Sequence, residues 1–453
     1  MKNTAPVEKN KIYTAIINDI GETGMGIGKI DGFTVFADGA LPGEEVKVLV
    51  MKVKKNYCYG KVMEIVNKSP YRCEAVCPVF KKCGGCQIMH LSYKGQLEFK
   101  TKKVKDCIER IGGLKGVEVL PALGAKEPLF YRNKAQFPVG DGKIGFYAKH
   151  SHNIIDTDKC YIQAPVNEAV LNAIKGYMAD NKVSAYDEKT GRGLIRHIFT
   201  RLGKTTGEIM VCLVVNGKKL PNEKDLVERI KDIDGVVSVM ININKESSNV
   251  ILGRDSRLLW GKDRIRDLIG EVKYDISHLS FYQVNPEQTR VLYEKALSLA
   301  DLKGGETVMD IYCGIGTISL FLAQKAKKVY GVEIVDAAIE DAKKNAELNN
   351  MTNTEFYVGK AEEVIPRLYK DGVRADVVVV DPPRKGCDIN VINTIIDMKP
   401  ERVVYVSCDP STLARDLKLL VEGGFEIKEV QPVDQFPQTV HVETVCLLEK
   451  RDN

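Results

Sequence analysis

Three short apolar runs, each ending in a polar turn, constrain the fold of the carboxyl-terminal part of the chain. The run 307–309 leads to Asp310, the run 377–380 to Asp381 and the run 403–406 to Cys408. Uninterrupted apolar runs of this length are typical of parallel strands that are buried on both faces. Ligands bind at the carboxyl ends of such strands in an open α/β sheet. The pattern therefore predicts that Cys408 lies where chemistry takes place.

The overall composition is that of an ordinary globular protein. With 453 residues, of which 44% are hydrophobic, the chain is long enough for two to four domains with separate cores. No apolar run approaches the roughly 20 residues that span a membrane, and the first residues lack the apolar core of a signal peptide. We expect a cytoplasmic protein without a membrane partner, and a monomer.

Residues 1–67 are expected to form a small β-barrel. Alternating strands are predicted over 12–20, 33–36, 45–54 and 58–66. Turns are predicted at Gly21, over 24–28, which holds three glycines, and at Pro42 and Gly43. Small five-stranded barrels commonly bind oligonucleotides. Between residues 46 and 63 there are five lysines and no acid, interleaved with two tyrosines, and this composition suits a polyanion with stacking bases. A solvated lysine face is an equally good explanation of this stretch by itself.

Residues 68–275 are expected to form a central α+β domain, and residues 276–453 a doubly wound sheet. The central part holds a helix over 93–111 that could pack on the catalytic domain, then strands over 135–139, 195–201, 208–215 and 236–242. In the last segment helices over 287–300, 317–326, 337–349 and 412–422 alternate with strands. Its final strands, 425–433 and 441–448, have no helix between them. A terminal antiparallel hairpin of this kind is typical of methyltransferase sheets.

The turn after Asp310 predicts a nucleoside-binding pocket. Gly314 and Gly316 allow a ligand to approach the backbone before a helix begins. Nineteen residues after Gly314 the next strand ends in Glu333, where a carboxylate can accept hydrogen bonds from ribose hydroxyls. The G-x-G-x-x-G motif of nicotinamide sites has a third glycine or similarly small residue at the position that Ser319 occupies here. We therefore favour S-adenosylmethionine over a nicotinamide nucleotide.

A cysteine at a strand end is more often inert than reactive, but two other features of this sequence favour a reactive Cys408. Glu443 on the final strand offers a base, and the glycine turn offers a cofactor. The three together suit methylation of a pyrimidine at C5. Addition of a thiolate to C6 makes C5 nucleophilic, and a base then removes the C5 proton.

Several motifs together resemble the RNA 5-methyluridine methyltransferase family, and the resemblance covers essentially the whole chain. These motifs are Phe281-Tyr282-Gln283-Val284-Asn285, Asp381-Pro382-Pro383-Arg384-Lys385-Gly386, Ser407-Cys408-Asp409-Pro410, Leu413-Ala414-Arg415-Asp416 and His441-Val442-Glu443. The resemblance implies Cys408 as nucleophile and Glu443 as base. It implies Phe281 as the stacking partner of the target uracil, for which a core position is the competing interpretation. The cofactor contacts are expected from Gln283, Asp310, Tyr312, Gly314, Glu333 and Asp381.

Twelve cysteines in a chain of this kind point to metal binding or catalysis. Cys77, Cys83 and Cys86 share one irregular loop, a spacing that holds zinc or an iron–sulfur cluster. With the distant Cys160, the spacing resembles the family branch that carries a [4Fe–4S] cluster. Cys73 could compete as a ligand.

The substrate expected from the resemblance is large-subunit ribosomal RNA. The amino-terminal segment resembles the TRAM module, and the barrel together with the cluster favours 23S ribosomal RNA over transfer RNA. The same reaction on transfer RNA is the nearest alternative. A non-catalytic RNA-binding or ribosome assembly factor is the alternative from another class.

Overall fold

The computed structural model describes residues 5–157 and 159–451, which form two compact units. One unit holds the chain up to Lys100 together with Phe436–His441. The other holds Thr101–Gln435 and the chain from Val442 onward. Each unit has hydrophobic clusters of its own.

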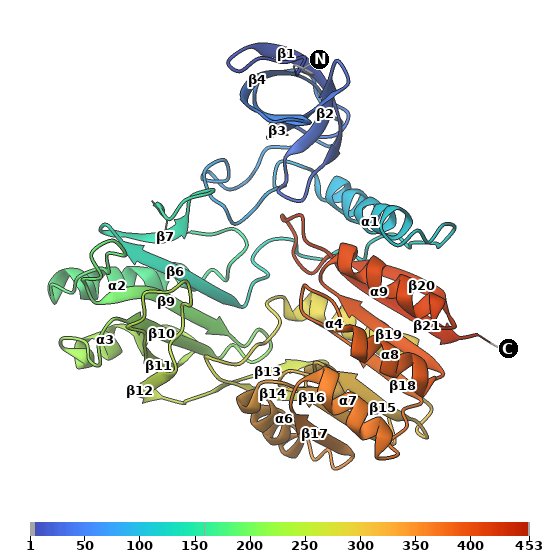
Figure 1. Cartoon of the computed structure of the whole chain (residues 1–453). Helices are drawn as coiled ribbons and strands as arrows, with labels where there is room; N and C mark the ends of the chain where they lie inside the picture. The colour runs from blue at the N-terminus through green and yellow to red at the C-terminus, as the bar shows by residue number, and fades with distance from the viewer. Residues whose placement is uncertain (1–4, 158, 452–453) are drawn as a thin grey trace. The chain divides into compact units, whose positions relative to one another are not determined.

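The first unit contains a closed five-stranded barrel (Figure 1). Its strands, in the order β1-β2-β3-β5-β4, are β1 (Ile12–Ile20), β2 (Gly26–Ile30), β3 (Phe33–Asp38), β4 (Glu45–Val53) and β5 (Tyr57–Asn67). Apolar side chains point inward at every second position, as Val46, Val48 and Val50 do in β4. Closure leaves the barrel without an open edge.

The predicted turn forms at Gly21 and Gly24, where Gly24 has φ 83°, but the expectation that it extends to residue 28 is wrong, because Gly26 and Gly28 lie in β2. A Cβ atom at Gly28 would come within 2.4 Å of the carbonyl oxygen of Ile16, and one at Gly26 within 2.7 Å of that of Ala40. The neighbouring strands of the barrel therefore pack too closely for any larger residue. These glycines allow close approach inside a strand and do not make a turn.

The second unit contains a seven-stranded catalytic sheet in the order β17-β16-β15-β18-β19-β21-β20. Its strands are β15 (Thr307–Ile311), β16 (Lys328–Glu333), β17 (Thr354–Val358), β18 (Val377–Val380), β19 (Arg402–Ser407), β20 (Phe425–Val433) and β21 (Glu443–Lys450). The first five are parallel, and β21 runs antiparallel to both β19 and β20. This arrangement confirms the predicted methyltransferase-type sheet with its terminal hairpin.

Helices cover both faces of this sheet (Figure 1). They are α4 (Pro286–Ala300), α5 (Thr317–Ala323), α6 (Asp336–Leu348), α7 (Ala361–Lys370), α8 (Ile389–Met398) and α9 (Pro410–Glu422). Val377 and Val379 of β18 belong to the core shared with α4 and α5, whereas Val378 and Val380 belong to the core shared with α7, α8 and α9. The unbroken valine run thus reflects burial on two sides. Val104 and Ile108 of α1 (Tyr93–Arg110) join the second core.

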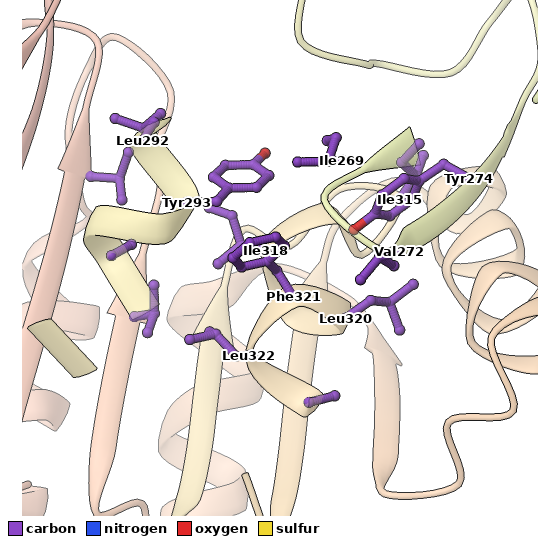
Figure 2. Close-up of a cluster of buried hydrophobic side chains, with 14 of the residues drawn as sticks. Ile269, Val272, Tyr274, Leu292, Tyr293, Ile315, Ile318, Leu320, Phe321 and Leu322 are labelled. Carbon is purple, nitrogen blue, oxygen red and sulfur yellow. The ribbon is translucent and has the colours of Figure 1, made fainter. Parts of the chain in front are cut away.

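A two-stranded hairpin, β13 (Ile265–Ile269) with β14 (Val272–Ile276), packs on the first core. Figure 2 shows Ile269, Val272 and Tyr274 of the hairpin around Tyr293 of α4 and Phe321 of α5. The domain boundary expected near residue 275 falls within β14, whose side chains are buried in this core.

A second seven-stranded sheet of the same unit has the order β12-β11-β10-β9-β6-β7-β8. Its elements are β6 (Lys134–Gly140), β7 (Lys143–Tyr147), β8 (Ile154–Asp156), α2 (Asn167–Asp180), β9 (Ile195–Leu202), β10 (Ile209–Val215), α3 (Glu223–Ile230), β11 (Val236–Ile243) and β12 (Asp255–Gly261). One face packs on α2 and α3, and Phe199, Met210 and Cys212 on the other face belong to the core of the catalytic sheet. The central segment is therefore α+β, as predicted. Among the helices of the described ranges, none combines the length and apolar character that a membrane span requires.

Candidate active site

Strand register places Cys408 beside Glu443. In the antiparallel pair of β19 and β21, Ser407 lies opposite Thr444. Cys408 directly follows Ser407 and Glu443 directly precedes Thr444, and the charge of Glu443 is close enough to raise the pKa of the Cys408 thiol. On the other side of β19, β18 ends immediately before Asp381. Cys408, Glu443 and Asp381 are thus gathered at one edge of the sheet from three adjacent strands.

Burial and nearby carboxylates raise the pKa values of the three groups at this edge. Burial raises the pKa of Glu443 to about 8, and the charge of Asp381 adds to the effect. Burial and then the charge of Asp310 raise the pKa of Asp381 to about 7. Burial raises the pKa of the Cys408 thiol to about 12, with further contributions from Glu443 and Asp381. The positive charge of Arg384 opposes the shifts of Glu443 and Cys408. At neutral pH the free protein therefore holds a thiol and not a thiolate at position 408.

We expect Cys408 of the free protein to react slowly with iodoacetamide, because the thiolate is the reactive form and burial raises the pKa of this thiol to about 12. The rate should rise with pH. Glu443→Gln should accelerate alkylation, since it removes a negative charge that raises the pKa of the thiol. Peptide mass spectrometry at several pH values measures this, with Glu449→Gln on the same strand as the control. Equal rates in the Glu443→Gln and unaltered proteins would contradict the electrostatic coupling.

Asp416 fixes the loop that carries Arg384. This buried carboxylate accepts hydrogen bonds from the Cys387 backbone N–H at 2.8 Å and from the Tyr405 hydroxyl at 2.6 Å. It also accepts one from Arg415 Nε at 2.7 Å, and the Arg415 guanidinium donates to the Lys385 carbonyl at 3.0 Å. The sequence analysis assigned no role to Asp416 and Arg415, although both stand in a motif quoted for the resemblance.

The glycine turn after β15 has open space beside it and is fixed by hydrogen bonds to residues at the end of β16. Tyr312 has a positive φ of 71°, and its N–H donates to the Val332 carbonyl at 2.9 Å. At Gly314, with φ 55°, a Cβ atom would meet nothing within 4 Å. The Gly314 N–H donates to Glu333 Oε2 at 3.2 Å, and the Val335 N–H donates to Glu333 Oε1 at 2.9 Å. Open space beside a fixed carboxylate is what a nucleoside requires.

Asp310 lies buried beneath this turn. Ser319 donates a hydrogen bond to its Oδ2 atom, while its Oδ1 atom has no partner among the described residues. Burial raises the pKa of Asp310 to about 7. The Tyr274 hydroxyl donates a hydrogen bond to the Thr317 carbonyl at 2.9 Å, and the Tyr293 hydroxyl is hydrogen-bonded to Thr317 Oγ1, also at 2.9 Å. These two bonds anchor the first turn of α5. The glycine turn is therefore held by hydrogen bonds at Glu333 and Thr317, and its open space together with the carboxylates of Asp310 and Glu333 fits an adenosylated ligand.

Phe281 stands out as the most exposed of the large hydrophobic side chains of the described residues, at 67%. The competing interpretation of Phe281 as a core residue is therefore wrong. Its neighbour Tyr282 is buried, with its hydroxyl 3.3 Å from Asp267 Oδ2, and Asn285 caps α4. The backbone carbonyl of Gln283 accepts a hydrogen bond from Asn133 Nδ2 at 3.0 Å. An exposed ring on a fixed segment can offer a flat surface to a base.

The cysteine loop of the first unit is built from tight turns. Backbone N–H groups of Phe80 and Cys83 donate to the carbonyls of Cys77 and Val79, at 3.1 and 2.8 Å. The Gly85 N–H donates to Cys83 Sγ at 3.4 Å, a contact that suits a thiolate. Over residues 5–157 and 159–451, no three His, Cys, Asp or Glu side chains converge on a metal position. The iron–sulfur ligands thus stay a prediction.

Aromatic rings and lysines share one part of the barrel surface. Phe36, Tyr57 and Tyr59 form a triad with ring centroids 5.5 to 5.6 Å apart. In the strand register Tyr59 lies opposite both Phe36 of β3 and Lys52 of β4. Lys47, in contrast, is paired with Glu64 at 2.7 Å.

Comparison with known proteins agrees with this geometry. Residues 92–451 match the model of the tRNA (uracil-5-)-methyltransferase family. An uncharacterized RNA methyltransferase of Halalkalibacterium halodurans is 54% identical over the whole of both chains. One of Bacillus cereus is 53% identical over 99% of each chain. The chain belongs to the uracil-5 RNA methyltransferase family. Residues 6–63 also match the TRAM domain, which covers the barrel.

A solved structure with the same fold is the tRNA (uracil-54, C5)-methyltransferase of Pyrococcus abyssi in complex with S-adenosyl-L-homocysteine. It is 32% identical to this chain, with a TM-score of 0.79, and the match covers 96% of this chain and 100% of the archaeal one. So extensive a match includes most of the barrel. The barrel by itself therefore does not distinguish a ribosomal from a transfer-RNA substrate, because a transfer-RNA enzyme matches this chain over nearly its whole length.

Proposed function

We propose that this family member transfers a methyl group from S-adenosylmethionine to C5 of a uridine in 23S ribosomal RNA. The observation that supports the proposal is that Cys408 and Glu443 flank Ser407 and Thr444, the last residue pair of the neighbouring strands β19 and β21. A thiol and a carboxylate on neighbouring strands can act in turn on C6 and C5 of one pyrimidine ring.

Six residues are proposed to hold the cofactor: Gln283, Asp310, Tyr312, Gly314, Glu333 and Asp381. S-adenosylmethionine supplies an electrophilic methyl group. The Glu333 carboxylate is held by two backbone N–H groups and is suited to ribose hydroxyls. The unpartnered Oδ1 atom of Asp310 and the open face of Gly314 leave polar capacity and space in the cradle.

Cys408 is proposed to lose its thiol proton to solvent as its sulfur adds to C6 of the uracil, and this addition gives C5 the electron density to take the methyl group. Glu443 then accepts the C5 proton, and the electrons of the broken C–H bond reform the C5–C6 double bond as Cys408 leaves. Phe281 is proposed to stack on the target base, which must leave its helical stack to reach Cys408. Stacking would offset part of the few kcal/mol that this costs.

The barrel face that holds Phe36, Tyr57 and Tyr59 and the neighbouring lysines is proposed to bind the RNA. Aromatic rings stack on unpaired bases and lysines neutralise phosphates. Transfer RNA is the second candidate substrate, favoured by the match to the Pyrococcus abyssi enzyme. Mapping 5-methyluridine in both RNAs from cells lacking this gene separates the two. Loss from 23S ribosomal RNA supports the proposal, and loss from transfer RNA alone overturns this choice of substrate.

We further propose a [4Fe–4S] cluster on Cys77, Cys83 and Cys86, with Cys160 as the fourth ligand that the family resemblance implies. Cys73 is the weaker candidate, because its Sγ contacts the Met89 carbonyl at 3.7 Å. Purification without air should give a brown protein with roughly four irons per chain. Cys83→Ser should lower the iron content sharply, whereas Cys73→Ser should not. Stoichiometric zinc without iron in the anaerobic protein would contradict the cluster.

A further inference from the structure

Two basic side chains face each other across strands of the central sheet. In the antiparallel pair of β6 and β9, Lys134 lies directly opposite Arg201. Arg132, two residues before Lys134, adds a third positive charge close enough to lower the pKa of Lys134. Like charges in directly opposed positions of a sheet repel one another. Arg132, Lys134 and Arg201 are called the cationic cluster below.

Arg201 of the cationic cluster is buried, Arg132 and Lys134 are partly exposed, and none of the three has a counter-ion among the described residues. Arg201 is only 2% exposed, and burial lowers its pKa to about 10. Burial and the two arginines lower the pKa of Lys134 to about 8. Within the described ranges, no carboxylate forms an ion pair with any of the three residues. Buried charges are normally paired, because an uncompensated one is costly to desolvate.

Arg201 also keeps unused donors. Its Nη2 atom donates to the Ser280 carbonyl at 2.8 Å, but Nε and Nη1 have no partner among the described residues. A guanidinium with two free N–H groups matches the oxygens of a tetrahedral anion. The hydrogen bond to Ser280 also ties Arg201 to the residue before the exposed Phe281.

We propose that the cationic cluster is a phosphate subsite that takes one phosphodiester of the RNA next to the base stacked on Phe281. The inference rests on the proposed function, because it assumes an RNA substrate and a stacking role for Phe281. The phosphodiester would contact the partly exposed Arg132 and Lys134 and supply the counter-charge that the buried Arg201 lacks. Binding of the backbone at this point would tie recognition of the strand to the position of the Phe281 segment.

The test uses the full-length protein, oligouridylate of about ten nucleotides, and Lys134→Met. Removal of one buried, repelled charge should raise the melting temperature in phosphate-free buffer. The same variant should bind oligouridylate more weakly, and the slope of log Kd against log salt should fall by about 0.7, the value for one phosphate on a single strand. Lys143→Met, at an exposed position of β7, should leave the slope unchanged. Arg201→Gln should lower the slope in the same way if it folds.

The affinity for S-adenosylhomocysteine separates the two anions that could fill the cluster. The proposal expects that affinity to stay within a few-fold in Lys134→Met. A lost cofactor affinity with an unchanged RNA slope would assign the cluster to the cofactor carboxylate and overturn the proposal. An unchanged slope overturns it whatever the melting temperature does. Since binding is measured without turnover, a lowered slope would support the subsite even if methyl transfer were absent.

Discussion

Cys408→Ala is expected to abolish methyl transfer, with a loss of at least about 10⁴-fold in kcat, because removal of a covalent nucleophile usually has an effect of this order. Without addition at C6, C5 of uracil is too poor a nucleophile to take a methyl group. The affinity for S-adenosylhomocysteine should stay within a few-fold, since the proposed cofactor residues do not include Cys408. Radiolabelled methyl transfer to RNA and equilibrium dialysis measure the two quantities.

Cys408→Ser is the matched variant, because it keeps the size of the side chain and exchanges only the nucleophilic atom. It should be nearly as inactive as Cys408→Ala, since a serine hydroxyl next to the charges of Glu443 and Asp381 is far harder to ionise than a thiol. If either variant methylates RNA at the unaltered rate, Cys408 is not the nucleophile.

Glu443→Gln is expected to stop the reaction one step later. The methyl group should still be transferred, but loss of the C5 proton should slow by about 10²–10⁴-fold, the usual contribution of a general base. A methylated protein–RNA adduct should therefore accumulate with unmodified RNA, visible as a band that resists denaturation. Glu449→Gln, on the same strand, should turn over normally and trap nothing.

The raised pKa of Glu443 also predicts the pH dependence of this step. A base acts in its ionised form, so with a pKa of about 8 the rate should rise with pH up to about 8 and fall below it. This dependence should vanish in Glu443→Gln. If Glu443→Gln turns over normally and accumulates no adduct, another group or a water molecule removes the C5 proton.

Much of the fold follows from residue patterns alone. The valines of β18 and the apolar run of β19 could be predicted as buried strands because covering helices on both faces remove any need for alternation. β2 could not be predicted as a strand from local sequence. Its glycines are required by close contacts with Ile16 and Ala40, which arise only in the folded barrel. β13 and β14 are short strands whose partners and core come from other segments.

The site shows a similar division. Cys408 and Asp381 directly follow strand ends, Asp310 lies one residue before the end of β15, and all three could be found from local sequence. Their mutual effects on pKa depend on which strands are neighbours, a property of the sheet order. The pairing of Lys134 with Arg201 likewise depends on a register between strands more than sixty residues apart in the chain, as the numbering shows. No local pattern marks a residue as the buried counterpart of another.

The central claim is that Cys408 forms a covalent bond with the uracil it methylates. Intact-mass spectrometry of the protein incubated with S-adenosylmethionine and RNA containing 5-fluorouridine at the target position tests this directly, because fluorine cannot leave C5 as a cation. The account predicts a stable species with the mass of protein, RNA and one methyl group, with the attachment mapped to Cys408 and absent from Cys408→Ala. Methylation of ordinary RNA without any such adduct on 5-fluorouridine RNA would contradict it.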